Sequence, residues 1–316
     1  ILRVMMCKPY TVGLVGARGH VGREMMALIE ASPDFELVMA TSREHDGKTI
    51  SAVFDTLKSD VIFEALTPDA VAARGCDILV LGLPNGLAAP YVEAIEANAP
   101  KTLLLDLSAD YRHEPGWVFG LSDLLPHNIK CATRIANPGC YATAAILTLY
   151  PLKDIISGGV SVFGVSGYSG AGTTPGPKND PDRLRDNILP YGFNGHGHQT
   201  EISKAIGHPV RFMPHVASFF RGLITTVSVS LKPGVSLAEV QQLYQGAYAD
   251  NPTVHLQEDP PELREVANTP NAIIGGMALD ESTNMLALSC VHDNLLKGAA
   301  SQAMDNLRLA LDLSSA

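Results

Sequence analysis

Short, almost uninterrupted apolar runs alternate with segments of helical spacing through the first third of the chain. The runs lie at residues 10–16, 35–42, 76–84 and 101–108, and helical spacing follows at residues 21–32 and 87–98. Strands that are apolar on both faces are typical of a parallel sheet covered by helices on both sides. The alternation therefore predicts an α/β fold with a Rossmann-type, doubly wound parallel sheet.

The second half of the chain has a different pattern. Partly alternating, strand-like segments lie at residues 159–167, 210–216, 221–231, 271–279 and 285–293. Few helices separate them, although Ser236 and Glu239 have the spacing of a capping box that opens a helix. This half predicts an α+β domain with a largely antiparallel sheet.

Composition narrows the class of protein. The chain has 316 residues, 46% of them hydrophobic, and a net charge of −10, which predicts a globular protein of about two domains and argues against nucleic-acid binding. Its cysteines are odd in number and form no CxxC pair, so we expect neither a disulfide framework nor a zinc knuckle; they are Cys7, Cys76, Cys131, Cys140 and Cys290. No apolar run has the length of a membrane span. We expect a cytoplasmic protein, or a mitochondrial one if a targeting segment precedes residue 1.

A glycine-rich turn follows the first predicted strand. In "GLVGARGHVG", Gly16, Gly19 and Gly22 are spaced by three between strand and helix. Glycine there permits a tight turn and the close approach of a phosphate to the helix N-terminus, although ordinary tight turns also use glycine. The position of this turn after the first strand of a predicted parallel sheet favours dinucleotide binding.

The second predicted strand ends in "ATSRE", which bears on the choice of dinucleotide. Ser42 and Arg43 precede the first acid, Glu44. A hydroxyl and a guanidinium suit the 2′-phosphate of NADP, whereas an NAD site favours a carboxylate at this place. The alternative is a solvated arginine in a loop.

Cys140 follows Pro-Gly and opens an apolar, helical segment in "ANPGCYATAA". A helix N-terminus stabilises thiolate and so makes a nucleophile. A buried cysteine that serves as a small hydrophobe is the plainer alternative.

Two histidines and two arginines could complete a site. His196 and His198 lie two apart before a helix. One of them could be the base for Cys140, or both could be ordinary loop residues or metal ligands. Further metal ligands are not evident in the sequence, so we expect no metal. Arg112 and Arg221 lie in loops and suit phosphate or carboxylate, with surface ion pairs as the alternative.

Seven segments together resemble the N-acetyl-γ-glutamyl-phosphate reductase family, NADPH-dependent enzymes of arginine biosynthesis. They are "GLVGARGHVG", "LSADYR", "ANPGCYATAA", "FGVSGYSGAGTTPGPKND", "HGHQTEI", "MPHVASFFRG" and "DNLLKGAASQA". The loop "SGYSGAGTTPGPKNDP" is most similar to the branch with fungal and some bacterial members. Gly197 departs from the many relatives that carry a basic residue between the two histidines.

The resemblance implies roles for these residues. Cys140 would be the nucleophile and His198 the base, with His196 nearby and the reverse assignment still open. Arg112 and Arg221 would hold the phosphate and carboxylate of the substrate. The residues expected to bind NADP are Gly16, Arg18, Gly19, Gly22, Ser42, Arg43, Pro84, Asn85, Ser169, Gly170 and Asn294.

The family also implies an aspartate-semialdehyde dehydrogenase-like organisation, in which the last helix returns to the first domain. We expect an NADP-binding domain at residues 1–138 plus about 294–316, a catalytic and oligomerisation domain at 139–293, and a homodimer or homotetramer. The implied reaction is the NADPH-dependent reduction of N-acetyl-glutamyl 5-phosphate through a thioester on Cys140. The alternatives are a related acyl-phosphate reductase, such as aspartate-semialdehyde dehydrogenase, and a non-catalytic NADP-binding sensor.

Overall fold

The computed structural model describes residues 8–313, which form two compact units. The first comprises the chain up to residue 119, residues 129–137 and the chain from residue 307; the second comprises residues 120–128 and 138–306. The chain passes from the first unit to the second near residue 138 and returns to the first at Leu307. Residues 120–128 belong to the second unit. The expected domains, at residues 1–138 plus about 294–316 and at 139–293, stay a prediction.

The first unit is built on a seven-stranded sheet in which every described pair of neighbouring strands is parallel. Its order is β3-β2-β1-β4-β5-β7-β6, which is the doubly wound arrangement that the apolar runs predict. The strands are β1 (Tyr10–Val15), β2 (Phe35–Thr41), β3 (Phe63–Glu64), β4 (Ile78–Leu81), β5 (Leu103–Asp106), β6 (Val118–Phe119) and β7 (Arg134–Ala136).

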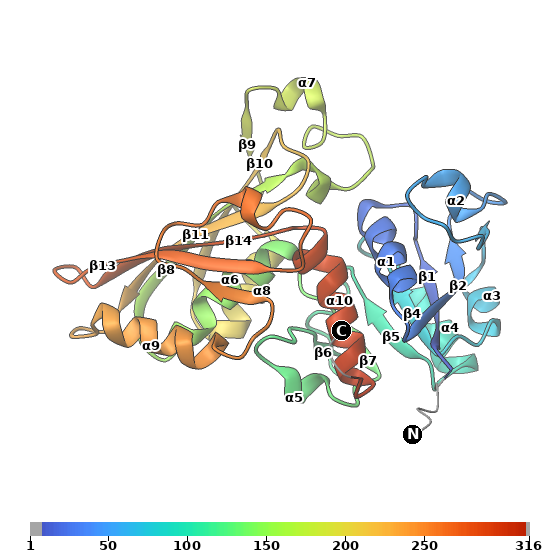
Figure 1. Cartoon of the computed structure of the whole chain (residues 1–316), viewed down its shortest axis with the longest axis horizontal. Coiled ribbons are helices and arrows are strands. Elements are labelled where there is room, and N and C mark those ends of the chain that lie inside the picture. Colours follow the sequence, from blue (N-terminus) through green and yellow to red (C-terminus); the bar gives the residue numbers. More distant parts are fainter. Residues whose placement is uncertain (1–7, 314–316) are drawn as a thin grey trace, which may run out of the picture. The chain divides into compact units, whose positions relative to one another are not determined.

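Helices cover both faces of this sheet. Helices α3 (Pro68–Ala73) and α4 (Ala89–Asn98) share a buried cluster with Val15, Leu81 and Leu104 of the central strands. Helix α1 (His20–Ala31) lies on the other side of the strands, as Figure 1 shows, and buries Met25, Met26 and Ile29. The short α2 (Ile50–Val53) and α5 (Pro126–Ile129) were not anticipated from the sequence. The sheet is therefore buried on both faces, as continuous apolar strands require.

The second unit contains a mixed, seven-stranded sheet of order β12-β13-β14-β11-β8-β10-β9. Most neighbouring pairs are antiparallel, as predicted, but β8/β10 and β12/β13 are parallel. Its strands are β8 (Ile156–Gly167), β9 (Ile188–Pro190), β10 (Val210–Ala217), β11 (Leu223–Leu231), β12 (Val254–Leu256), β13 (Ala272–Asp280) and β14 (Met285–His292). Buried and more exposed residues alternate along β11 and along the middle of β8, which is typical of a sheet with one covered face.

Helices α6 (Cys140–Leu149), α8 (Gly197–Ile206) and α9 (Leu237–Tyr248) lie on one side of this sheet in Figure 1. Helix α6 is the centre of the layer, since every residue from Tyr141 to Leu149 is buried. Helix α9 begins with the predicted Ser236–Glu239 capping box, and its Tyr248 hydroxyl donates to the carbonyl of Leu147 in α6. The short α7 (Pro181–Leu184) and three single-turn 3₁₀ helices, η1 (Tyr150–Leu152), η2 (Tyr168–Ala171) and η3 (Leu263–Glu265), complete the unit. Within residues 8–313, no helix is both long and apolar enough to span a bilayer.

The last helical segment differs from the single α-helix predicted from about Asn294. It begins with a π-helical turn, η4 (Leu296–Ala300), and continues as α10 (Ser301–Ala310). Polar side chains on it bind residues 120–123: Asn306 donates to the Gly120 carbonyl at 2.7 Å, and the buried Lys297 pairs with Asp123. These contacts explain why residues 120–128 and the helix up to Asn306 share a unit.

Candidate active site

Cys140 is the first residue of α6, as the sequence predicts. The cap residue Gly139 is extended, with φ −73° and ψ 151°, and offers no side-chain acceptor to the first turn. The rest of the helix is buried while the cysteine is partly exposed. The thiol therefore stands at the positive end of a helix dipole, where a thiolate is favoured.

Glu201 joins the cysteine turn to the histidine segment. It is 2% exposed; one carboxylate oxygen accepts from the Gly139 N–H at 3.0 Å, and the other lies 4.0 Å from His198 Nε2. Residue-by-residue analysis of the sequence missed it, although its place one helical turn after His198 in "HGHQTEI" was a usable signal. The carboxylate orients the backbone beside the thiol and faces the imidazole.

The two histidines differ in their surroundings. His196 caps α8, since its Nδ1 accepts from the His198 N–H at 3.3 Å. An accepting Nδ1 leaves the His196 proton on Nε2. His198 lies inside the first turn of α8, and its side chain is 17% exposed. His198 is therefore the histidine that faces the buried carboxylate of Glu201.

Aromatic side chains surround this cluster. The Tyr141 ring lies 5.0 Å from Phe212 and 6.0 Å from His198, centroid to centroid. Room for Tyr141 comes from Gly164 of β8, where a Cβ would stand 2.5 Å from the ring. Burial, followed by the nearby charge of Cys140, raises the pKa of Tyr191 above its usual value. Tyr191 thus stays protonated and can donate a hydrogen bond near the thiol.

A buried polar group lies behind Cys140. A Cβ on Gly298 would stand 2.8 Å from Cys140 Cβ and 3.2 Å from His292 Nε2, so all three residues meet. Burial, reinforced by the charge of Lys297, lowers the pKa of His292 to about 3. Lys297 is itself buried and lies 2.7 Å from Asp123 and 2.9 Å from Thr253 Oγ1. His292 is therefore neutral at ordinary pH. Because Gly298 has no side chain, η4 can pack closely on Cys140.

Four more of the predicted residues come together at the carboxyl end of β14. Asn294 donates to Ser169 Oγ at 2.9 Å and accepts from the Gly222 N–H, next to Arg221, at 2.7 Å. A Cβ on Gly170 would lie 3.5 Å from the Asn294 amide nitrogen. Arg221 pairs with the buried Asp293. The predicted nicotinamide loop and a predicted substrate arginine are thus held by one dipeptide, Asp293–Asn294.

The glycine-rich turn of the first unit has the expected form. Gly16 has φ +81°, and a Cβ there would stand 2.7 Å from the Gly82 carbonyl oxygen. Gly22 lets α1 pack closely on the turn, because its Cβ would stand 2.5 Å from the Ala17 oxygen. By contrast, Gly19 faces open space and caps α1 without a side chain. The three glycines therefore serve the tight turn, the open approach to backbone N–H groups and the packing of the helix, as a dinucleotide turn requires.

The end of β2 lies beside this turn, since the Gly16 N–H donates to Thr41 Oγ1 at 3.1 Å. Ser42 is buried, and its Oγ accepts from the His45 N–H at 3.2 Å. Arg43 is exposed. Arg18 forms an ion pair with Glu44, and both side chains are about half exposed.

The carboxyl ends of β4 and β5 are tied together by their loops. Asn85 accepts from the Ala109 N–H at 3.0 Å, while Asp110 accepts from the Gly86 N–H at 2.7 Å. Pro84 and Asn85 are exposed on this edge. Arg112 donates to the backbone carbonyls of Asn137 and Leu107 at 2.9 and 3.3 Å. In parallel sheets of this kind ligands bind at the carboxyl ends of the strands, so these loops are suitably placed.

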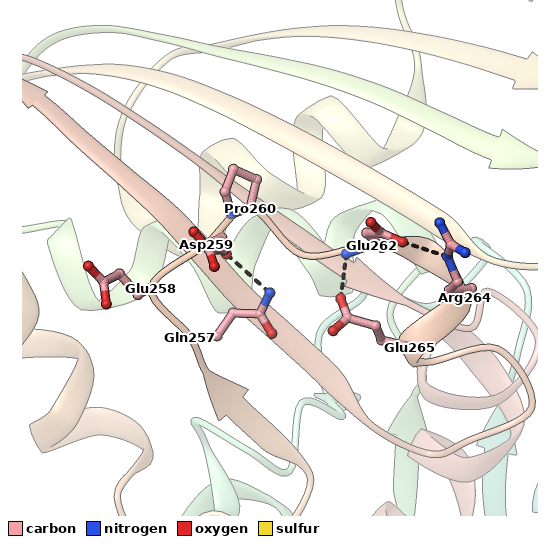
Figure 2. Close-up of a pocket in the computed structure, with 7 residues that line it drawn as sticks. All are labelled: Gln257, Glu258, Asp259, Pro260, Glu262, Arg264 and Glu265. Carbon is pink, nitrogen blue, oxygen red and sulfur yellow. Dashed lines mark hydrogen bonds and ion pairs between the residues drawn. The ribbon is translucent and has the colours of Figure 1, made fainter.

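Figure 2 shows a separate hollow in the second unit, after β12. It is lined by four carboxylates and one arginine, together with Gln257 and Pro260; the charged residues are Glu258, Asp259, Glu262, Glu265 and Arg264, and Arg264 pairs with Glu262. Such a lining repels phosphates and carboxylates. Across the described part of the chain, no group of three or more His, Cys, Asp or Glu residues could hold a metal ion. Cys7 lies outside the described residues.

Comparison with known proteins identifies the family. The model of "Semialdehyde dehydrogenase, NAD binding domain" matches residues 11–132, and that of "Semialdehyde dehydrogenase, dimerisation domain" matches residues 140–294. N-acetyl-gamma-glutamyl-phosphate reductase of Xanthomonas campestris pv. campestris (strain 8004) is 46% identical over 307 residues, 97% of each chain. The enzyme of that name from Xylella fastidiosa (strain M23) is 45% identical, covering 96% of this chain and 93% of its own.

The chain belongs to the N-acetyl-gamma-glutamyl-phosphate reductase family. This confirms the resemblance that the seven sequence segments indicated.

Solved structures confirm the fold expected for this reductase family. Aspartate semialdehyde dehydrogenase II of Vibrio cholerae, complexed with ASA, has a TM-score of 0.76 at 18% identity and covers 97% of this chain and 99% of its own. Aspartate semialdehyde dehydrogenase of Candida albicans, solved with NADP, has a TM-score of 0.77 at 17% identity and covers 96% of this chain and 98% of its own.

Proposed function

We propose that this member of the reductase family reduces N-acetyl-L-glutamyl 5-phosphate to N-acetyl-L-glutamate 5-semialdehyde and phosphate, in arginine biosynthesis. Family membership supports the reaction. The observation that carries the chemistry is the position of Cys140 on the tip of α6, with Glu201 bound to the preceding N–H and facing His198.

The cysteine would act as a covalent nucleophile. Its thiolate attacks the acyl carbon, the carbon–oxygen bond to phosphate breaks, and a thioester forms on Sγ. Backbone N–H groups of the first turn of α6 lie at the positive end of the helix, where they can stabilise the oxygen anion of the tetrahedral intermediate. After reduction, collapse of the thiohemiacetal releases the aldehyde and restores the thiolate.

His198 would carry the proton in these steps. Its imidazole takes the thiol proton before attack and protonates the oxyanion that forms later. Glu201 faces the ring, with one oxygen 4.0 Å from Nε2, and its negative charge would stabilise the imidazolium that forms. His196, whose Nδ1 is engaged by the His198 N–H, retains Nε2–H as a donor toward substrate.

The first unit fits a nicotinamide dinucleotide. The evidence is the left-handed Gly16, the open space at Gly19 and an α1 first turn that carries no acidic residue. Gly16, Gly19 and Gly22 would hold the pyrophosphate, and Pro84 and Asn85 would lie on the nicotinamide side. The family resemblance also assigns a nicotinamide role to Ser169, Gly170 and Asn294. When bound, the cofactor would supply the hydride that reduces the thioester.

We further propose that the dinucleotide is NADP. Arg43 is exposed and Arg18 is bound by an exposed carboxylate that a 2′-phosphate could replace. Both guanidiniums could give charge-assisted hydrogen bonds to that phosphate. Ser42 can donate its hydroxyl proton while its oxygen caps the following turn.

A homo-oligomer is the proposed state in solution. Outward-facing side chains such as Phe163, which is 42% exposed, Thr226 and Ala287 lie on the sheet face opposite α6. The matching family model is that of a dimerisation domain, which supports a dimer formed through this face. Light scattering of the wild type and of Phe163→Glu tests it, because a charge at a buried dimer centre should yield monomer.

A cytoplasmic location remains a proposal from the sequence, to be tested with a fluorescent fusion of the full-length protein.

The decisive assay runs the reaction in the oxidative direction. Phosphate-dependent reduction of NADP is measured with N-acetylglutamate semialdehyde and, in parallel, with aspartate semialdehyde. We expect turnover with the acetylated substrate only. Turnover with aspartate semialdehyde alone would assign the chain to the other dehydrogenase activity, and failure with both would refute the enzyme assignment.

A further inference from the structure

We propose that Asp293 is the positioning residue that orients Arg221 toward an anionic group of the substrate. This inference rests on the proposed function, in which Arg221 binds a phosphate or carboxylate. Arg221 lies in the loop between β10 and β11, and its side chain is 16% exposed. Its Nε lies 3.3 Å from Asp293 Oδ2, and its Nη1 donates to Asn268 Oδ1.

The carboxylate of Asp293 is buried and accepts hydrogen bonds from three backbone N–H groups. The side chain is 0% exposed. Oδ1 accepts from the N–H groups of Leu295 and Leu296 at 2.9 and 3.3 Å, and Oδ2 accepts from the Asn268 N–H at 2.8 Å. A buried carboxylate that is both paired and hydrogen-bonded has one orientation, and it gives the same constraint to its partner.

The backbone around Arg221 is fixed by the neighbouring residue. Asn294 accepts from the Gly222 N–H, and the Ser169 N–H donates to the Phe220 carbonyl at 3.0 Å. The arginine is therefore constrained at its backbone by Asn294 and at its guanidinium by Asp293 and Asn268. A planar guanidinium held between the Asp293 carboxylate and Asn268 Oδ1 keeps one plane, which suits the recognition of an oxyanion.

Asp293 also lies next to the residues that contact the thiol. Its carbonyl accepts from the Gly298 N–H at 2.9 Å, and Gly298 packs on Cys140. One residue thus sets both the plane of Arg221 and the start of the turn behind Cys140. This arrangement predicts that loss of the Asp293 charge weakens substrate binding more than it changes the backbone turn, since an asparagine retains the main-chain hydrogen bond.

The test compares Asp293→Asn, Asn268→Gly and the control Glu262→Gln in the oxidative assay. Glycine suits residue 268, whose φ is +63°, and removes the acceptor without straining the loop. Glu262 pairs with Arg264 at an exposed site. We expect Asp293→Asn to raise the KM for phosphate or for the semialdehyde by about 10–100-fold and to change kcat by less than about 3-fold. Asn268→Gly should raise the same KM by about 3–10-fold. Glu262→Gln should change neither KM nor kcat.

A double variant distinguishes orientation from general stability. In an Arg221→Lys background the planar fork is gone, so adding Asp293→Asn should raise KM by less than about 2-fold. Additive effects, or an unchanged KM in both single variants, would overturn the proposal.

A readout without turnover keeps the inference separate from the proposed function. The Arg221 side-chain Nε–H signal, assigned by its loss in Arg221→Lys, should exchange slowly with water in the wild type and at least about 10-fold faster in Asp293→Asn. If the wild type lacks activity but the exchange rates differ as expected, the proposed substrate is wrong and the orienting contact is real. Equal exchange rates would overturn the role of Asp293 whatever the activity.

Discussion

The turns that open α1 and α6 are alike in backbone and opposite in surroundings. Each helix begins after a glycine with φ of −73° and has no side-chain cap. Around Gly19 the space is open and the nearby charges, Arg18 and Glu44, are about half exposed. Around Cys140 lie the buried Glu201, the close-packed Gly298 and the ring of Tyr141. The same helix start can therefore receive a large ligand through backbone groups or hold one reactive atom in place.

The comparison predicts how variants behave in the two regions. Where a single atom reacts inside a packed cluster, one substitution should abolish turnover. Where many exposed groups share the binding of a phosphate, each substitution should cost little.

The largest effect is expected at Cys140. Cys140→Ser should lower kcat by about 10⁴-fold or more, because the hydroxyl is far less ionised than a thiol, while binding of NADPH is retained. Turnover and cofactor titration measure the two quantities. Cys131→Ser, at an exposed cysteine of the first unit, is the matched control and should keep wild-type activity; loss of activity there instead would reject the assignment of the nucleophile.

His198→Asn should lower kcat by about 10²–10⁴-fold, the usual range for removing a positioned acid or base. His196→Asn should change KM more than kcat. The pH dependence of kcat/KM decides between them, since the residue whose variant loses a titration step near neutrality carried the proton. If His196→Asn is the variant that loses that step, the two roles are exchanged.

Gly298→Ala tests the close packing behind the thiol. The new Cβ would stand 2.8 Å from Cys140 Cβ, so the cysteine or η4 must shift, and a displacement near 1 Å lowers the rate by about 10²-fold. Gly246→Ala, at an exposed glycine of α9 with no atom within 4 Å of its Cβ position, is the control and should raise stability by up to about 1 kcal/mol. Equal activity of both variants would show that the packing does not position Cys140.

His292 gives the second unit a pH-dependent stability. Its pKa of about 3 lies below the ordinary 6.5, so the unfolded chain binds a proton between these values and the folded protein does not. Stability contributed by this group is complete above pH 6.5, falls by about 1.4 kcal/mol for each unit of pH between 6.5 and about 3, and changes no further below that. Urea unfolding at several pH values should show this slope, and His292→Asn should remove it; an unchanged slope would assign the pH dependence to other groups.

The smallest effects are expected at the end of β2. Arg43→Ala should lower kcat/KM for NADPH by about 3–10-fold and leave the value for NADH unchanged, because only the 2′-phosphate loses a contact. Glu44→Gln should raise kcat/KM for NADPH by about 2-fold, since it releases Arg18. A wild type that uses NADH equally well would refute the choice of NADP without affecting the chemistry at Cys140.

Features that depend on a local pattern of residues could be predicted from the sequence. Apolar runs on both strand faces require a covered parallel sheet, so β1, β2, β4 and β5 were predicted within a few residues. Gly16 and Cys140 were found because a left-handed turn and a helix N-terminus depend on neighbouring residues alone. The family, confirmed by relatives that are 46% identical, was evident from the same local segments.

Contacts between residues that are distant in the sequence became visible in the folded chain. Glu201 binds a backbone N–H 62 residues away, and Gly298 is required to be glycine because Cys140 and His292 approach it from other elements. The parallel pair β8/β10, the π-helical turn η4 and the pairing of Asp293 with Arg221 likewise follow from long-range packing. A pattern along the chain reports which side chains are buried, but not which of them share the same buried space.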